Sequence, residues 1–168
     1  MYRNIRAAVV GSINMDIILN MEKVPEIGEN VVGTDYGYAC GGKGANQAIG
    51  LARLGAKVSM IGKVADDSNG SRLIDNLIKN NVDVSGVSSE GTQTGLAAII
   101  IDGEGRNRIV VYEGANSEID PFEAADLLSD DLGLLLVQFE THENVVVEQP
   151  VVEETTVSTE GTSIITIK

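Results

Sequence analysis

The sequence contains one cysteine, one histidine and no tryptophan. A lone cysteine excludes an internal disulfide framework, and one cysteine with one histidine cannot build a zinc site. No apolar run approaches the ~20 residues that cross a bilayer as a helix, and the N-terminal residues turn polar too early for a secretory signal peptide. We therefore expect a cytoplasmic protein with no bound metal.

Basic side chains are missing from the last third of the sequence. Residues 1–112 carry 12 acidic and 11 basic side chains, whereas residues 113–167 carry 13 acidic ones and no lysine or arginine. The formal net charge of −13 repels nucleic acid and anionic membranes, so neither is expected as a partner. The imbalance indicates either a solvated acidic face or a last third that is compositionally foreign to the rest.

The order of the predicted elements indicates an α/β protein. The chain has 168 residues, of which 43% are hydrophobic, enough for one domain with a core. Apolar β-rich segments alternate with segments in which apolar residues recur at helical spacing. This order predicts right-handed βαβ crossovers, and hence a partial doubly wound (Rossmann-like) parallel sheet with helices on its faces. The expected strands are 6–13, 57–64 and 82–87, and the expected helices are 43–54 and 67–79.

A second set of β-rich segments does not fit this alternation. Residues 15–21 and 30–39 favour strands, the latter as a bulged strand or a strand pair. Asp102-Gly103 lies between two β-rich runs and predicts a hairpin over 94–112. The remaining expected elements are a short helix that opens at Ser117 or Asp120 and a buried strand over 133–139.

The segment ACGGKGANQA (residues 39–48) places three glycines and Lys43 directly before a predicted helix. From Gly37 to Lys43 the spacing satisfies G-x-x-x-x-G-K, so a phosphate-binding loop is one interpretation. Gly44 stands where that loop needs a Ser or Thr hydroxyl for Mg²⁺, which argues against it. A structural glycine turn with a solvated Lys43 is a further alternative.

A second candidate feature is the segment Asn14-Met-Asp16, which follows the first predicted strand. Open parallel sheets place their ligand crevice at this end of a strand. In an extended segment, Asn14 and Asp16 point to the same side. A carboxylate accepts hydrogen bonds while an amide both donates and accepts, which suits vicinal hydroxyl groups. Capping or turn formation is the alternative role for both residues.

Together these motifs resemble the ribokinase-like (PfkB-type) family of carbohydrate kinases. The resemblance covers residues 5–140 almost without gaps and is limited to the N-terminal half of the family. Its most specific part is GGKGAN (41–46). The other matching stretches are GSINMDIILNMEKVPEIGE (11–29), the remainder of 41–70, VDVSGV (82–87), TGLAAIIIDGEGRNRIVVYEGAN (94–116) and LLLVQFE (134–140).

The resemblance implies a binding site for ribose or a similar small sugar. Asn14 and Asp16 are implied to bind the sugar hydroxyls, and Glu140 to close the pocket. The segments near 15–39 and 94–112 look like the family's β-sheet lid, which pairs with the lid of a second subunit, so a homodimer is expected. Leu96, Ala98, Ile100 and Ile109 are candidates to face the carbon side of the sugar, or else to pack in the core. The implied second wall consists of Gly41, Gly42, Lys43, Gly44 and Asn46.

The sequence also departs from the family. Members are nearly twice this length, and their Gly-Ala-Gly-Asp signature, which supplies the anion hole and the catalytic base, has no counterpart here. We therefore assign no catalytic residue and no cofactor to this chain, although ATP and Mg²⁺ serve the intact family. The expectation is a catalytically incomplete sugar-binding half, in which phosphoryl transfer is either impossible or requires a complementing ATP-binding half. The alternative is a non-enzymatic structural or sugar-binding domain, truncated or engineered.

Residues 141–168 differ from the amphipathic helix with which the family continues. They are rich in Val, Thr and Ile, which favour strands, and Pro150 interrupts them. Strands over 155–159 and 162–167 are expected to form a hairpin. We therefore divide the chain into a ribokinase-like unit, 1–140, and an atypical β-rich tail, 141–168.

Overall fold

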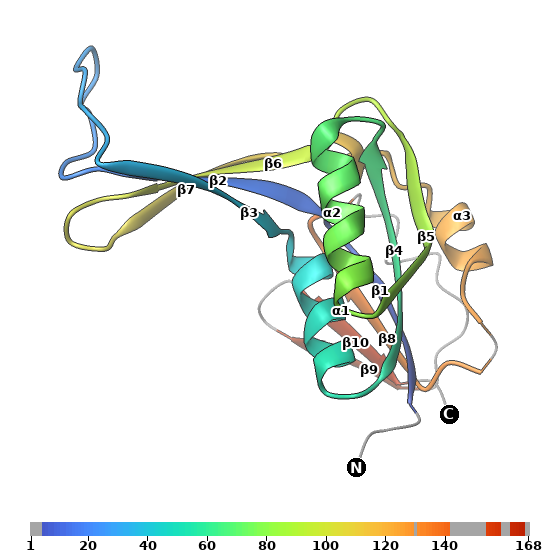
Figure 1. The fold of residues 1–168 in the computed structure, drawn as a ribbon. Helices are drawn as coiled ribbons and strands as arrows, with labels where there is room; N and C mark the ends of the chain where they lie inside the picture. Colours follow the sequence, from blue (N-terminus) through green and yellow to red (C-terminus); the bar gives the residue numbers. More distant parts are fainter. Residues whose placement is uncertain (1–4, 130, 142–153, 159–161, 167–168) are drawn as a thin grey trace.

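The computed structural model describes residues 5–129, 131–141, 154–158 and 162–166. A six-stranded sheet in the order β5-β4-β1-β8-β10-β9 forms the body, and a four-stranded sheet in the order β3-β2-β6-β7 projects from it as a lid (Figure 1). The strands β5, β4, β1 and β8 are parallel, which confirms the predicted α/β fold. These strands span Arg6–Val10 (β1), Lys57–Ala65 (β4), Val82–Gly91 (β5) and Leu134–Gln138 (β8).

The central strand β1 separates two hydrophobic clusters. Ala7 and Val9 lie in a cluster with apolar residues of α1 (Lys43–Arg53) and α2 (Ser68–Lys79). Ala8 and Val10 lie in a second cluster with Ile119, Leu132 and Ala124 of α3 (Pro121–Asp126). Since successive side chains of a strand point to opposite faces, α1 and α2 cover one face of the sheet and α3 the other. This two-sided burial explains why β1 is apolar from Ala7 to Val10 rather than alternating.

The helix boundaries follow the capping residues that the sequence provides. Helix α1 is followed by Gly55, whose φ of 95° suits the left-handed position after a helix. Helix α2 begins after Asp67, whose carboxylate accepts hydrogen bonds from the Gly70 N–H (2.7 Å) and the Thr94 hydroxyl (2.8 Å). Burial raises the pKa of Asp67, but these and neighbouring hydrogen bonds outweigh it, so the net pKa is lowered. Asp67 thereby ties the start of α2 to the segment that enters the lid.

The lid consists of β2 (Asn14–Asn20), β3 (Asp35–Gly41), β6 (Gly95–Ile101) and β7 (Asn107–Tyr112). The predicted strand over 30–39 begins later than expected, at Asp35. Asp35 pairs with Asn20, the last residue of β2, so the residues before it have no strand opposite them. The predicted hairpin between β6 and β7 is present, and the Asp102 carboxylate accepts hydrogen bonds from the N–H groups of Glu104 and Arg106 in its turn.

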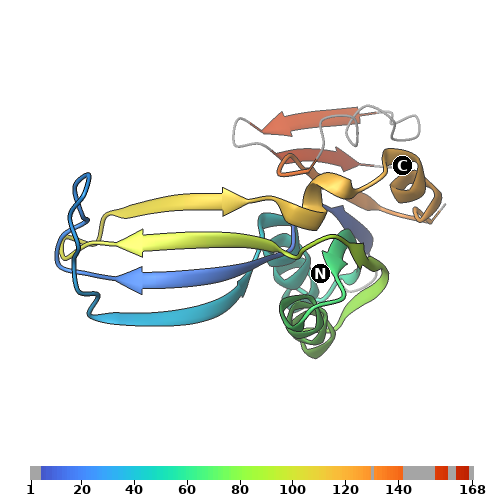
Figure 2. The ribbon, with the colours of Figure 1, turned by 90° about the horizontal axis from the view of Figure 1, so that it is seen from above.

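The tail contributes the two remaining strands of the body sheet. Strands β9 (Glu154–Ser158) and β10 (Thr162–Thr166) pair antiparallel, and their bounds lie within one residue of the strands predicted for this hairpin. The predicted turn at Glu160-Gly161 lies outside the described residues. Strand β10 also pairs antiparallel with β8, so the tail covers the outer edge of β8 (Figure 2). Within the described ranges, no helix is long and apolar enough to span a membrane.

Candidate functional site

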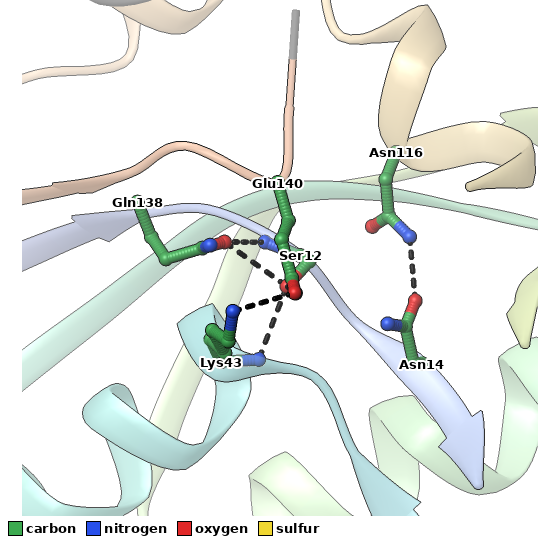
Figure 3. Close-up of polar contacts among 6 residues, drawn as sticks. All are labelled: Ser12, Asn14, Lys43, Asn116, Gln138 and Glu140. Atoms are coloured by element: carbon green, nitrogen blue, oxygen red, sulfur yellow. Dashed lines mark hydrogen bonds and ion pairs between the residues drawn. The ribbon is translucent and has the colours of Figure 1, made fainter. Parts of the chain in front are cut away.

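Polar side chains from distant parts of the sequence meet where the lid joins the body. Ser12 follows β1, Lys43 is the first residue of α1, Gln138 is the last residue of β8, and Glu140 follows two residues later (Figure 3). Asn14, the first residue of β2, is paired with Gly41 on one side and Gly95 on the other. The site thus lies at the carboxyl ends of parallel strands, as expected for an open α/β sheet.

The glycines before α1 allow two backbone segments to touch. A Cβ atom on Gly42 would lie 2.5 Å from the Ser12 carbonyl oxygen, and one on Gly44 would lie 2.7 Å from the carbonyl carbon of Gly11. Gly42 also has a φ of 93°, which favours glycine. Only Gly42 separates β3 from α1, so the phosphate-loop interpretation is wrong because no loop is present to surround a phosphate.

Ser12 connects three of the segments that form the site. Its hydroxyl oxygen accepts a hydrogen bond from the Lys43 N–H (3.1 Å), and its carbonyl accepts one from the Ala45 N–H (3.0 Å). Its single hydroxyl proton is shared between Glu140 Oε2 (2.9 Å) and Gln138 Oε1 (3.0 Å). Ser12 therefore caps α1 from outside the helix and orients the end of β8. Sequence reasoning missed both Ser12 and Gln138.

Lys43 and Glu140, both predicted site residues, form an ion pair. The distance from Lys43 Nζ to Glu140 Oε1 is 2.8 Å, and the two side chains are 61% and 28% exposed. The solvated-lysine alternative is thus only partly right: Lys43 is exposed but held by a carboxylate. Asn46 lies three residues further along α1, on the same helix face, and is exposed.

Asp16 is a predicted site residue whose surroundings disfavour the charged form of its carboxylate. It is half-buried, and among the residues that the structure describes its carboxylate has no hydrogen-bond donor. Burial raises the pKa of Asp16, and the negative charge of Glu140 raises it further. A Cβ atom on Gly41 would lie 2.2 Å from Asp16 Oδ2, so glycine at position 41 makes room for this carboxylate.

Asn14 is 4% exposed and pairs with Asn116, a residue that sequence reasoning missed. The Asn14 Oδ1 atom accepts a hydrogen bond from Asn116 Nδ2 at 2.7 Å. Asn14 is the first residue of a strand rather than a helix, so it does not act as a helix cap. The sequence pointed to Asn116 only in that it is the last residue of the stretch 94–116, which resembles the ribokinase-like family.

The strand register separates the apolar candidates onto two faces of the lid. Asp16 is paired with Ala97, so these two residues share a face of the lid. Ile99, two residues after Ala97, lies on that face as well, and so does Ile109, which is paired with Ile99. Leu96, Ala98 and Ile100 are paired with Met15, Ile17 and Leu19. They therefore lie on the opposite face of the lid from Asp16, together with the buried Met15.

The sequence profile of pfkB family carbohydrate kinases matches residues 4–151. The chain belongs to this family. Ribokinase of Bacillus subtilis is 42% identical over 154 residues, which cover 91% of this chain and 49% of that protein. Deoxyribokinase of Salmonella typhi is 35% identical over 137 residues, covering 79% of this chain and 44% of that protein.

The likeness extends to solved structures of pfkB-type kinases. Arabidopsis thaliana ribokinase complexed with ribose and ATP superposes with a TM-score of 0.71 at 29% identity, over 84% of this chain and 47% of that one. Ribokinase of Thermotoga maritima gives a TM-score of 0.72 at 29% identity, over 86% and 48%. The chain spans about half the length of the curated relatives it matches.

The environment of Asp16 predicts that its charge lowers the stability of this pfkB-family chain. Because its pKa is raised in the folded state, the folded protein holds the proton more tightly, and stability falls as the pH rises above the ordinary value of 3.8 through the folded-state pKa. Asp16→Asn should therefore raise the melting temperature near neutral pH, and the gain should shrink toward pH 3.8. Asp35→Asn, an exposed carboxylate on the adjacent strand, is the control. A lower melting temperature for Asp16→Asn at neutral pH would contradict this reading.

Proposed function

We propose that this chain is the sugar-binding half of a ribokinase-type kinase and that its ligand is ribose or a closely similar sugar. Support comes from its relatives, which include ribokinases and a deoxyribokinase, and from the solved ribokinase that holds ribose and ATP. Phosphorylation of the sugar by ATP belongs, in this proposal, to the intact kinase.

The observation that carries the proposal is the half-buried Asp16 carboxylate, which lacks a donor in the described part of the chain. Removing a carboxylate from water without a hydrogen bond is costly, and vicinal sugar hydroxyls would supply the missing donors. A bound hydroxyl pair would also stabilise the charged form of Asp16. Lys43 and Glu140 add a donor and an acceptor beside it.

The other site residues complete a surface suited to a polyhydroxylated ligand. Gly41 places backbone next to Asp16 without a side chain, Gly42 lies against the backbone of residues 12–14, and Gly44 keeps the first turn of α1 close to Gly11. Asn46 offers an exposed amide on the same helix face as Lys43. On the lid, Ile109 lies on the face of Asp16 and is exposed, so it supplies apolar surface for the carbon side of a sugar, whereas Ala97 on the same face is buried.

We expect this chain alone to form no ADP above background when mixed with ribose, ATP and Mg²⁺. Phosphoryl transfer depends on groups positioned around the γ-phosphate, and the anion hole and base of the family have no counterpart in this sequence. A coupled ADP assay measures this, with Bacillus subtilis ribokinase as the positive control. Turnover that disappears in Lys43→Ala would contradict the expectation.

Ribose should bind weakly, and its binding should depend on Asp16. Asp16→Ala leaves the hydroxyls that Asp16 would accept unpaired, which should weaken binding by roughly 1–3 kcal/mol, or about 5- to 150-fold in Kd. Calorimetric titration of both proteins measures the difference, and Asp35→Ala is the matched control. Equal affinity of wild type and Asp16→Ala removes Asp16 from the site. The absence of binding in the wild type would favour the non-enzymatic structural alternative.

The lid also supports a proposed homodimer. Both of its faces expose apolar side chains, and β3 and β7 are open edge strands. Exposed apolar surface of this kind marks interaction sites, and open edges invite pairing with another chain. One face could close over the sugar while the other packs on a second lid. The exposed residues are Tyr36 (66%), Tyr38 (54%), Ile109 (53%), Val110 (66%) and Tyr112 (53%).

Sedimentation at several protein concentrations should therefore show a reversible dimer. The variant Ile109→Asp/Val110→Asp places a charge on each face of the lid and should raise the dimer Kd about tenfold or more, because charged groups would be buried at the interface. Leu54→Asp/Ile78→Asp is the control, since these residues are similarly exposed on the body. A wild type that remains monomeric at high concentration would exclude the dimer.

A further inference from the structure

We propose that Asn116 is a positioning residue that determines which end of the Asn14 amide faces the ligand. The inference rests on the proposed sugar site, because it assigns a polarity to one of its contacts. Asn116 lies in the short helix η1 (Gly114–Glu118), directly after the last lid strand, and is 1% exposed. It meets Asn14 across the junction between lid and body (Figure 3).

Two backbone groups fix the orientation of the Asn116 side chain. Its Oδ1 accepts a hydrogen bond from the Ile13 N–H at 2.8 Å, and its Nδ2 donates one to the Glu113 carbonyl at 2.9 Å. An N–H can only donate and a carbonyl can only accept, so a flipped Asn116 amide would oppose like groups at both contacts. A third, longer contact from Nδ2 to the Ile13 carbonyl (3.4 Å) also requires this orientation.

The orientation of the Asn116 amide determines the orientation of the Asn14 amide. The second Nδ2 proton of Asn116 needs an acceptor, and Asn14 supplies its Oδ1 at 2.7 Å. The Nδ2 of Asn14 must then point away from Asn116, and Figure 3 shows it on the side of Lys43 and Glu140. It has no hydrogen-bond partner within the described ranges, although the side chain is almost fully buried. Asn14 therefore presents a donor to the site.

Gly95 gives this amide pair the room it needs. It lies opposite Asn14 on β6, and a Cβ atom there would lie 2.2 Å from Asn116 Nδ2 and 2.3 Å from Asn14 Oδ1. Any side chain at position 95 would displace one of the two amides. This accounts for glycine at the start of an otherwise apolar strand, GLAAIII.

The consequence is a site with defined hydrogen-bond polarity. Asn14 donates, whereas the Asp16 carboxylate accepts, so the two neighbouring residues contact different partners on a ligand. A ligand oxygen at Asn14 must offer a lone pair, and a ligand group at Asp16 must offer a proton. Adjacent sugar hydroxyls can do both at once, one as acceptor and the next as donor. Without Asn116 the Asn14 amide could present either end.

Asn116→Asp tests the proposal with almost no change in shape. The introduced carboxylate still accepts from the Ile13 N–H but cannot donate to Asn14, so the Asn14 amide should flip and present Oδ1 to the ligand. Ribose affinity should fall about tenfold in calorimetry. In ¹H–¹⁵N spectra, the Asn14 side-chain NH₂ should exchange readily with water in the wild type and become protected in the variant. Ser117→Ala, in the same short helix, should change neither measurement.

The two readouts separate this inference from the proposed function. If wild type does not bind ribose but its Asn14 NH₂ exchanges and its Asn116 NH₂ is protected, the sugar proposal fails and the positioning role stands. If ribose binds equally to both proteins and the Asn14 signals are unchanged, the positioning role is overturned. Should Asn116→Asp not fold, the wild-type spectrum decides: a protected Asn14 NH₂ with an exchanging Asn116 NH₂ contradicts the proposal.

Discussion

The site depends on the close approach of two backbone segments, Gly11–Ile13 after β1 and Gly42–Gly44 at the start of α1. Added Cβ atoms on Gly42 and Gly44 would fall within 3 Å of main-chain atoms of the first segment, and main chain cannot move aside as a flexible side chain can. This contact places the Ser12 hydroxyl against the Lys43 N–H and within reach of Glu140. The ion pair between Lys43 and Glu140 is therefore oriented by backbone packing rather than by its own attraction, which is weak where a lysine is exposed.

At the candidate site, polar groups with hydrogen-bond partners lie next to polar groups without them. Ser12, Gln138 and Asn116 are buried and hydrogen-bonded, as buried polar groups in native proteins normally are. Asp16 and the Nδ2 of Asn14, a few residues away, have no hydrogen-bond partner in the part of the chain that is described. The first group builds a rigid frame, and the second leaves hydrogen-bonding capacity open for the proposed sugar. A carboxylate whose pKa is raised by burial and by Glu140 costs stability, a cost typical of functional sites.

The sequence could predict features that depend on local patterns. The helices at 43–53 and 68–79 carry their apolar spacing in contiguous residues, and Gly55 and Asp67 are caps that adjoin them in the sequence. The inner body strands β1, β4 and β8 are largely apolar runs. It could not predict which face of the lid Leu96 and Ala98 occupy, because a shift of one residue in register moves a side chain to the other face. Ser12 and Asn116 were missed for a similar reason: their partners Gln138 and Ile13 lie 126 and 103 residues away in the chain.

The tail is connected to the site through the edge of β8. Leu135 and Val137 are fully buried, so β8 has the character of an internal strand that needs a hydrogen-bonded neighbour on each side. Strand β1 is one neighbour, and β10 is the other. The pairing of Thr162 with Gln138 holds the backbone of the residue that contacts Ser12, two positions before Glu140. Whatever lies along this edge thus helps to fix the end of β8, and with it the carboxylate that pairs with Lys43.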